Sequence, residues 1–259
     1  MANTHIAFAD LKRKRVQFKD KRAYECQDAP NHFVPSMTTI LDCYPKGAQF
    51  YQMIKKHGEN VDLIFAEAME RGSDVHNLTE ILDAAGSVNV MDDNGVCRYD
   101  IKTIEQTYKY KEFRDRYPFK LKDNETSYGS LELGFGGTID RVFEDADGNL
   151  WLMDLKTGGV YDYYWLQLEG YRRLYNQYNR PEIAEGRIAI IHLDAKTRTE
   201  RDWQGKGWQI LFPERTAEDL WSDFQATKRL FHRTQPNFTP KNRIFDAVIS
   251  LKENEQNKY

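Results

Sequence analysis

At the centre of the chain stands the stretch GGTIDRVFEDADGNLWLMDLKTG, residues 136–158. Its segments 138–144 and 150–157 have the composition and length of strands, and the polar residues 145–149 between them predict a turn. Side chains alternate along a strand, so Asp154 and Lys156 point to the same face. In an antiparallel hairpin, a loop with an odd residue count centred on Asp147 would place Asp140 directly opposite Asp154.

A second register is open to this hairpin. A two-residue Asp147-Gly148 turn would set Asp140 against Leu155 and direct its carboxylate to the opposite face. The chemistry favours the first register, because two carboxylates on one face repel each other and a bound Mg²⁺ or Mn²⁺ relieves that repulsion. Lys156 can then orient a metal-activated water or neutralise transition-state charge. The structural alternative is an ordinary strand pair with an Asp–Lys salt bridge.

Hydrophobic periodicity places the elements around the hairpin. It predicts a short helix that begins after Ser36, which is a plausible N-cap, and four longer helices at 61–85, 101–117, 163–178 and 216–231. Further strands are expected at 126–135, 187–193 and 208–212. Gly72 interrupts the first long helix at a cost of about 1 kcal/mol relative to Ala, and Gly86 is a natural stop. The order predicts a mixed sheet flanked by helices.

The composition limits the classes of protein. The 259 residues, 40% of them hydrophobic, suit one large domain or one domain with an added helical part. The net charge of -3 is not that of a strongly basic chain, so binding of nucleic acid must rest on local patches. Three scattered cysteines, Cys26, Cys43 and Cys97, argue against a disulfide framework or a four-cysteine metal site. No segment resembles a signal peptide or a membrane span, which predicts a soluble cytoplasmic protein.

Several motifs together resemble those of the PD-(D/E)XK nuclease superfamily, specifically its RecB-like and phage exonuclease branch. Asp140 and Asp154-Leu155-Lys156 match the acidic residue and the acidic-x-Lys of that pattern. Gly72-Ser73-Asp74-Val75-His76 matches a Gly-x-x-x-His on an upstream helix, and Gln167-Leu168-Glu169-Gly170-Tyr171 matches a Gln-x-x-x-Tyr on the following helix. Residues 34–41 are similar to the opening of phage members. The likeness covers well over half of the chain.

The resemblance implies an α/β fold with a restriction-endonuclease-like core, in which a mixed central β-sheet is flanked by helices and preceded by additional N-terminal helices. It implies a single nuclease domain over residues 1–259. Some relatives carry a four-cysteine iron–sulfur cluster that this chain cannot supply, which favours the simpler phage or mitochondrial type. The parts of the domain are a basic N-terminal extension (1–33), a mainly helical part (34–123), a catalytic core (124–233) and a C-terminal tail (234–259).

The resemblance also implies residue roles. Gln167 and Tyr171 would support the catalytic Lys156 and a DNA phosphate, while upstream Glu132 is either a further carboxylate of the site or an exposed strand charge. The implied ligands of Mg²⁺ or Mn²⁺ are His76, Asp140, Asp154 and the Leu155 carbonyl. The implied catalytic residues are Asp140, Asp154, Lys156, Gln167 and Tyr171, and the expected nucleic-acid contacts are Arg114, Lys122, Thr157 and Arg172.

The implied activity is a metal-dependent DNA exonuclease that hydrolyses phosphodiester bonds in replication, recombination or repair. It would act on single strands or DNA ends in the cytoplasm, which is the host's if the chain is phage-encoded, and replication or recombination proteins are expected partners. Two alternatives stay open: a structure-selective endonuclease, and a DNA-binding protein that keeps the fold without chemistry.

Overall fold

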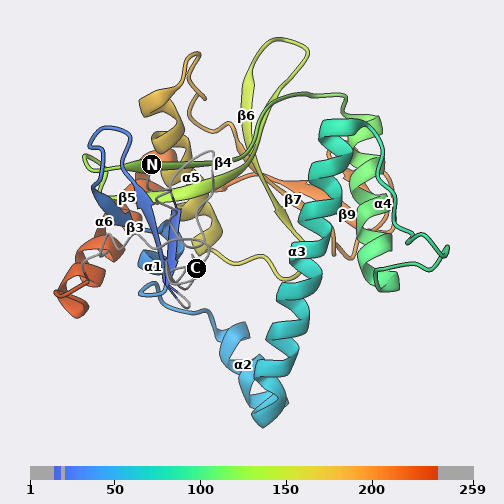
Figure 1. The fold of residues 1–259 in the computed structure, drawn as a ribbon, viewed down its shortest axis with the longest axis horizontal. Coiled ribbons are helices and arrows are strands. Elements are labelled where there is room, and N and C mark those ends of the chain that lie inside the picture. Colours follow the sequence, from blue (N-terminus) through green and yellow to red (C-terminus); the bar gives the residue numbers. More distant parts are fainter. Residues whose placement is uncertain (1–14, 19–20, 239–259) are drawn as a thin grey trace, which may run out of the picture.

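The computed structural model describes residues 15–18 and 21–238, which form two β-sheets and surrounding helices (Figure 1). The elements in chain order are β1 (Arg15–Phe18), β2 (Lys21–Glu25), β3 (Phe33–Pro35), α1 (Met37–Leu41), α2 (Ala48–His57), the 3₁₀ turn η1 (Gly58–Asn60), α3 (Val61–Ala85), α4 (Ile101–Arg116), β4 (Lys120–Ser130), β5 (Phe135–Glu144), β6 (Leu150–Lys156), α5 (Tyr163–Tyr178), β7 (Ile188–His192), β8 (Gln204–Gly205), β9 (Trp208–Leu211) and α6 (Ala217–Thr234).

The larger sheet has six strands in the order β4-β5-β6-β7-β9-β8. Strands β6 and β7 pair in parallel, and the other neighbours pair antiparallel. Parallel neighbours need a crossover connection, and here α5 provides it. The predicted mixed sheet flanked by helices is therefore confirmed.

Each face of this sheet carries its own hydrophobic core. Leu152 of β6 packs in a cluster with residues of α1, α5 and α6. Its neighbours Met153 and Leu155 pack in a second cluster with Val75 of α3 and residues of α4. In Figure 1, α5 and α6 lie on one side of the sheet and α3 and α4 on the other. Because both faces are covered, β6 and β7 are apolar almost throughout.

The β5–β6 hairpin has the register with an odd loop. Val142 pairs with Leu152 and Glu144 with Leu150, so the hairpin is centred on Asp147 and the connecting loop is 145–149. The Asp145 carboxylate organises this loop by accepting hydrogen bonds from the backbone N–H of Asp147 and of Asn149. The rival two-residue turn is excluded. This register turns Asp140 and Asp154 to the same face, directly beyond the last paired residues Arg141 and Met153.

Two adjacent glycines let other elements approach β5 closely. A Cβ on Gly136 would lie 2.4 Å from the Cβ of Tyr24 in β2, and a Cβ on Gly137 would lie 2.2 Å from a ring carbon of Tyr171 in α5. The small sheet β1-β2-β3 packs against β4 and β5 through this contact. The segment expected as an N-terminal basic extension thus contributes strands to the fold, while its residues 1–14 and 19–20 lie outside the described part.

Helix α3 has the predicted bounds and ends at Gly86, which adopts a left-handed conformation with φ of 73°. Its predicted apolar face, however, is not buried along its whole length. Leu63 is 66% exposed, because the first half of the helix does not reach the sheet, and in the second half Val75 and Leu78 are buried whereas Ile81 is 47% exposed. Helix α2 was not predicted from the sequence. Together with the first half of α3 it forms an arm that projects from the body of the molecule (Figure 1).

The remaining differences concern the ends of elements. The predicted strand 126–135 is wrong at both ends: β4 spans Lys120–Ser130, because residues 131–134 form the turn before β5. Helix α6 continues to Thr234, beyond the predicted limit at Phe231. Most of the expected tail, residues 239–259, lies outside the described part. Within that part, no helix combines the length and apolarity that a bilayer crossing requires.

The contact at Gly137 predicts opposite effects for two glycine substitutions. Gly137→Ala should lower the free energy of unfolding by about 1–3 kcal/mol, because the added methyl overpacks the Tyr171 ring. Gly72→Ala should raise it by up to about 1 kcal/mol, since the methyl meets Thr157 Oγ1 at an ordinary 3.4 Å and glycine disfavours a helix. Thermal unfolding compares the two, and equal effects would contradict this packing.

Candidate active site

The candidate site forms where β5 and β6 part. Their ladder ends at the pair Arg141–Met153, so the next backbone groups of β6 on that side have no strand partner. Side chains replace the strand: the Leu155 N–H donates to Asp140 Oδ2 at 3.2 Å, and His76 Nε2 lies 3.1 Å from the Leu155 carbonyl oxygen. Polar groups of three elements, α3, β5 and β6, therefore meet at one residue of the sheet.

His76 faces two carboxylates with its other ring nitrogen. Its Nδ1 lies 3.5 Å from Asp140 Oδ2 and 3.8 Å from Glu125 Oε1. Burial by itself lowers the pKa of His76, but the charge of Asp140 and the nearby Glu125 carboxylate outweigh burial and raise this pKa above its usual value. The surroundings of Nδ1 thus favour the protonated, positively charged form of the His76 ring.

Glu125 is a member of the site that the sequence did not reveal. Asn124 pairs with Arg141 and Thr126 with Ile139, which sets Glu125 opposite Asp140 on the neighbouring strand. Glu125 adopts a φ of 49°, an uncommon conformation for a residue other than glycine. The expected upstream carboxylate, Glu132, instead accepts a hydrogen bond from Gln177 in an exposed turn.

Asp154 and Lys156 form a buried ion pair on β6. Only 6% of the Asp154 side chain is exposed, and burial raises the pKa of this carboxyl to about 6, with Lys156 opposing the shift and Asp140 adding to it. For Lys156, burial by itself lowers the pKa, but Asp154 and Asp140 reverse the direction. The amine also lies 4.3 Å from the centre of the Tyr164 ring. The lysine is therefore held as a cation beside the two acids.

Gln167 and Tyr171 occupy the same face of α5, as their spacing predicts. Tyr171 is buried against Gly137, and the Gln167 side chain acts to lower its pKa. Burial raises the pKa of Tyr171 well above its usual value, to which the charges of Asp154 and Asp140 add. The phenol thus stays neutral and lies within electrostatic reach of both acids.

A buried ion cluster joins the helix that carries His76 to the strand that carries Asp140. Arg141, fully buried, donates to Asp83 Oδ2 and to Thr79 Oγ1 of α3 at 2.8 Å each. Asp83 also accepts from the Tyr110 hydroxyl and pairs with Arg114 of α4 at 2.8 Å. Removing one partner from such a cluster leaves a buried charge uncompensated. The cluster therefore fixes α3 and β5 relative to each other.

Of the expected nucleic-acid contacts, one reaches the site. Thr157 follows Lys156 and lines the pocket described below. Arg114 instead pairs with Asp83 and lies over the Phe143 ring, and Arg172 is buried against Glu169 and the Ile183 carbonyl. Lys122 pairs with Glu144, at the end of β5 that leads into the 145–149 loop, four residues from Asp140. The guanidinium groups of Arg114 and Arg172 are thus engaged by partners within the protein, which gives both residues a structural role.

The donor set suits a hard divalent cation. Ligand atoms of His76, Glu125 and Asp140 lie within 4.8 Å of one another. Two ligands of one cation can have this spacing, because Mg²⁺ and Ca²⁺ bind oxygen at about 2.0–2.6 Å. The Leu155 carbonyl adjoins the group through His76. The structure thus brings together His76, Asp140 and the Leu155 carbonyl of the expected ligands and adds Glu125, whereas Asp154 pairs with Lys156 and is not one of the three residues of this group.

Comparison of the chain with protein-family models and with curated proteins found no match. The likeness to nuclease motifs therefore rests on the residues themselves.

The raised pKa of Asp154 predicts how pH affects the stability of the metal-free protein. With a folded-state pKa of about 6 and an ordinary value of 3.8, this group lowers the unfolding free energy as pH rises between those values. Asp154→Asn removes this titration. In EDTA, the loss of the Lys156 partner lowers the melting temperature of the variant, but this melting temperature relative to that of wild type should rise by on the order of 5 °C between about pH 4 and pH 7. A difference independent of pH would contradict the burial of an ionisable acid here.

The ion cluster predicts a large cost for removing its acid. Asp83→Ala should lower the unfolding free energy by about 3–5 kcal/mol, because Arg141 stays buried without its partner. A matched control is Asp115→Ala, which breaks the exposed pair with Lys111 and should cost at most about 1 kcal/mol. Chemical denaturation measures both, and a similar small cost for the two variants would show that the cluster does not fix α3.

Proposed function

We propose that the chain is a Mg²⁺- or Mn²⁺-dependent deoxyribonuclease of the PD-(D/E)XK superfamily, in its RecB-like and phage exonuclease branch, with a restriction-endonuclease-like core. One observation carries the proposal: Asp140, Asp154 and Lys156 lie together where two strands part, with His76 of α3 beside them. Motifs that are far apart in the chain thus converge on one point. A structural ion pair alone does not require this convergence.

In the proposed reaction, a water molecule attacks the phosphorus of a DNA phosphodiester. The bond from phosphorus to the 3′ oxygen breaks, and the products are a 5′-phosphate and a 3′-hydroxyl that takes up a proton. A divalent cation held by the ligands named above would polarise the phosphate and lower the pKa of a bound water. The Lys156 ammonium, fixed by Asp154, would orient the water and stabilise the charge that develops on the phosphoryl oxygens.

The remaining site residues have supporting roles in this proposal. Tyr171 packs on Gly137 of β5, so it would hold this strand against α5, and Gln167 on the same helix face would support it. Glu125 adds a carboxylate beside His76 and Asp140. The substrate would be a DNA end or single strand met in replication, recombination or repair.

A nuclease assay with labelled DNA tests the proposal. Wild type with Mg²⁺ or Mn²⁺ should degrade linear DNA and spare covalently closed circles. Asp154→Ala and Lys156→Ala should each lower the rate by about 100-fold or more, because each removes a group that acts at the reacting phosphate. Glu132→Gln, on the exposed turn before β5, is the control and should keep the wild-type rate.

Other results of this assay would separate the alternatives. Equal rates for wild type and the two site variants would rule out the proposed active site. Cutting of closed circles at branched or single-stranded regions would favour the endonuclease. Tight binding of DNA without cleavage under either metal would favour a non-catalytic binding protein.

A further inference from the structure

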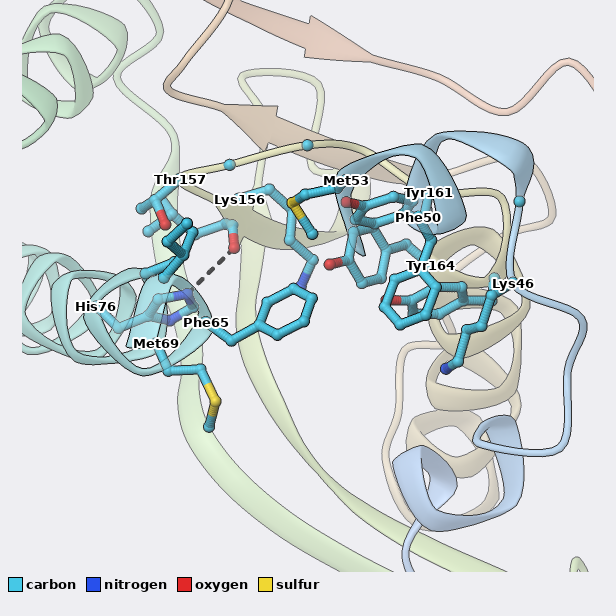
Figure 2. Close-up of a pocket in the computed structure, with 17 residues that line it drawn as sticks. Lys46, Phe50, Met53, Phe65, Met69, His76, Lys156, Thr157, Tyr161 and Tyr164 are labelled. Atoms are coloured by element: carbon cyan, nitrogen blue, oxygen red, sulfur yellow. Dashed lines mark hydrogen bonds between the residues drawn. The ribbon is translucent and has the colours of Figure 1, made fainter. Parts of the chain in front are cut away.

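A pocket of about 450 Å³ opens directly beside Lys156 and His76 (Figure 2). Its walls come from the arm, that is α2 and the first half of α3, and from the segment that joins β6 to α5. The volume falls in the range of about 300–1,000 Å³ that is typical of small-molecule sites. The candidate cation site and this pocket therefore share one wall.

Aromatic rings line the pocket on both sides. On the arm, the rings of Phe50 and Phe65 stack with centroids 5.9 Å apart. On the opposite side, Tyr161 and Tyr163 stack at 5.7 Å with an angle of 4° between their planes, and Tyr164 meets Tyr163 edge-on. Figure 2 shows rings from both sides directed into the same space as the Lys156 amine. The pocket thus offers faces on which a flat ring can stack.

The charged groups of the pocket are basic. Lys46 Nζ lies 4.9 Å from the Tyr163 ring centre, and Lys156 Nζ lies 4.3 Å from that of Tyr164. Among the described residues that line the pocket there is no carboxylate. An aromatic group flanked by negative charges fits such a lining, and a nucleobase between two phosphates is such a group.

The apolar lining on the arm is not part of the protein's core. No described side chain of α2 is buried, nor is any of residues 61–74 in α3, and Met69 at the pocket is 71% exposed. The hydrophobic surface that the arm presents toward Lys156 is therefore left to a bound molecule. Gly158 and Gly159 in the opposite wall carry no side chains that would fill the space.

We infer that this pocket binds an unpaired nucleobase of the nucleotide next to the phosphodiester that is cleaved. The inference rests on the proposed function and deepens it. A base in a duplex is covered by its neighbours and its partner strand, so it must be unstacked to enter. The substrate is then an unpaired DNA strand, and because stacking is indifferent to base identity, the pocket selects single-strandedness rather than sequence.

The test measures base stacking without metal, so it does not depend on cleavage. A short single-stranded oligonucleotide carries 2-aminopurine at one position, moved stepwise from the end, and its fluorescence is titrated with protein in EDTA. Wild type should quench one position strongly. Phe65→Leu and Tyr161→Leu, one from each wall, should weaken binding by roughly 5- to 150-fold, the equivalent of about 1–3 kcal/mol of stacking. Tyr51→Leu, an exposed ring of α2 outside the pocket, is the matched control and should bind as wild type.

A second oligonucleotide, with an abasic sugar at the quenched position, separates stacking from phosphate contacts. Wild type should bind this abasic strand as weakly as the two pocket variants bind the intact strand. The two variants should bind the abasic and the intact strand equally well. Their melting temperatures must first be shown to equal that of wild type. Equal binding of a blunt duplex and the single strand, or equal quenching by wild type and both variants, would overturn the inference. If the pocket variants lose quenching but neither metal supports cleavage by wild type, the base-binding inference holds and the nuclease proposal fails. If cleavage occurs and the pocket variants cleave as fast as wild type, the nuclease proposal holds and the base-binding inference fails.

Discussion

The register of the β5–β6 hairpin is the constraint on which the site depends. Asp145 fixes it, because its carboxylate accepts hydrogen bonds from the loop backbone and from the Trp151 indole at 2.9 Å. A shift by one residue would direct Asp140 to the opposite face of the sheet, away from Asp154. No later adjustment of side chains could restore the pair, since the faces of a strand alternate strictly. A turn with no chemistry of its own thus decides where the acids lie.

The end of the ladder matters as much as its register. Had β5 and β6 paired for two more residues, the Leu155 N–H and carbonyl would have been used by the strand partner. Because the ladder stops, Asp140 and His76 take these groups, and the buried Asp83–Arg141 pair holds α3 close enough for His76 to do so. The arrangement costs stability, because it buries an acid whose pKa rises to about 6. A cluster of side chains that lowers the free energy of unfolding is typical of functional sites, where activity and stability trade against each other.

Much of this architecture was predictable from the sequence because its signals are local. The hairpin, α3 and α5 follow from periodicity and from the residues at their ends, and of the expected metal ligands His76, Asp140 and the Leu155 carbonyl lie together. Glu125 was missed because its place opposite Asp140 depends on the register of the β4–β5 hairpin. The turn at 131–134 sets that register, with Ser130 paired to Phe135 across it. The register argument used for the β5–β6 hairpin applies to this turn as well. Arg114 and Arg172 resemble exposed helical cations in the sequence. Only the structure shows that Arg114 pairs with the distant Asp83, and that Arg172 is buried with Glu169 of its own helix and the Ile183 carbonyl. Helix α2 has no capping side chain at Gly47 and buries none of its described residues, so neither signal marked it.

The central claim is that the acids of β5 and β6 share one divalent cation with His76. The most direct measurement is anomalous diffraction from crystals of the protein soaked in Mn²⁺. A single strong peak is expected in contact with the carboxylate of Asp140 and the carbonyl of Leu155, and it should be lost in crystals of Asp140→Asn. Crystals that show no peak there, or a peak that persists unchanged in that variant, would contradict this claim.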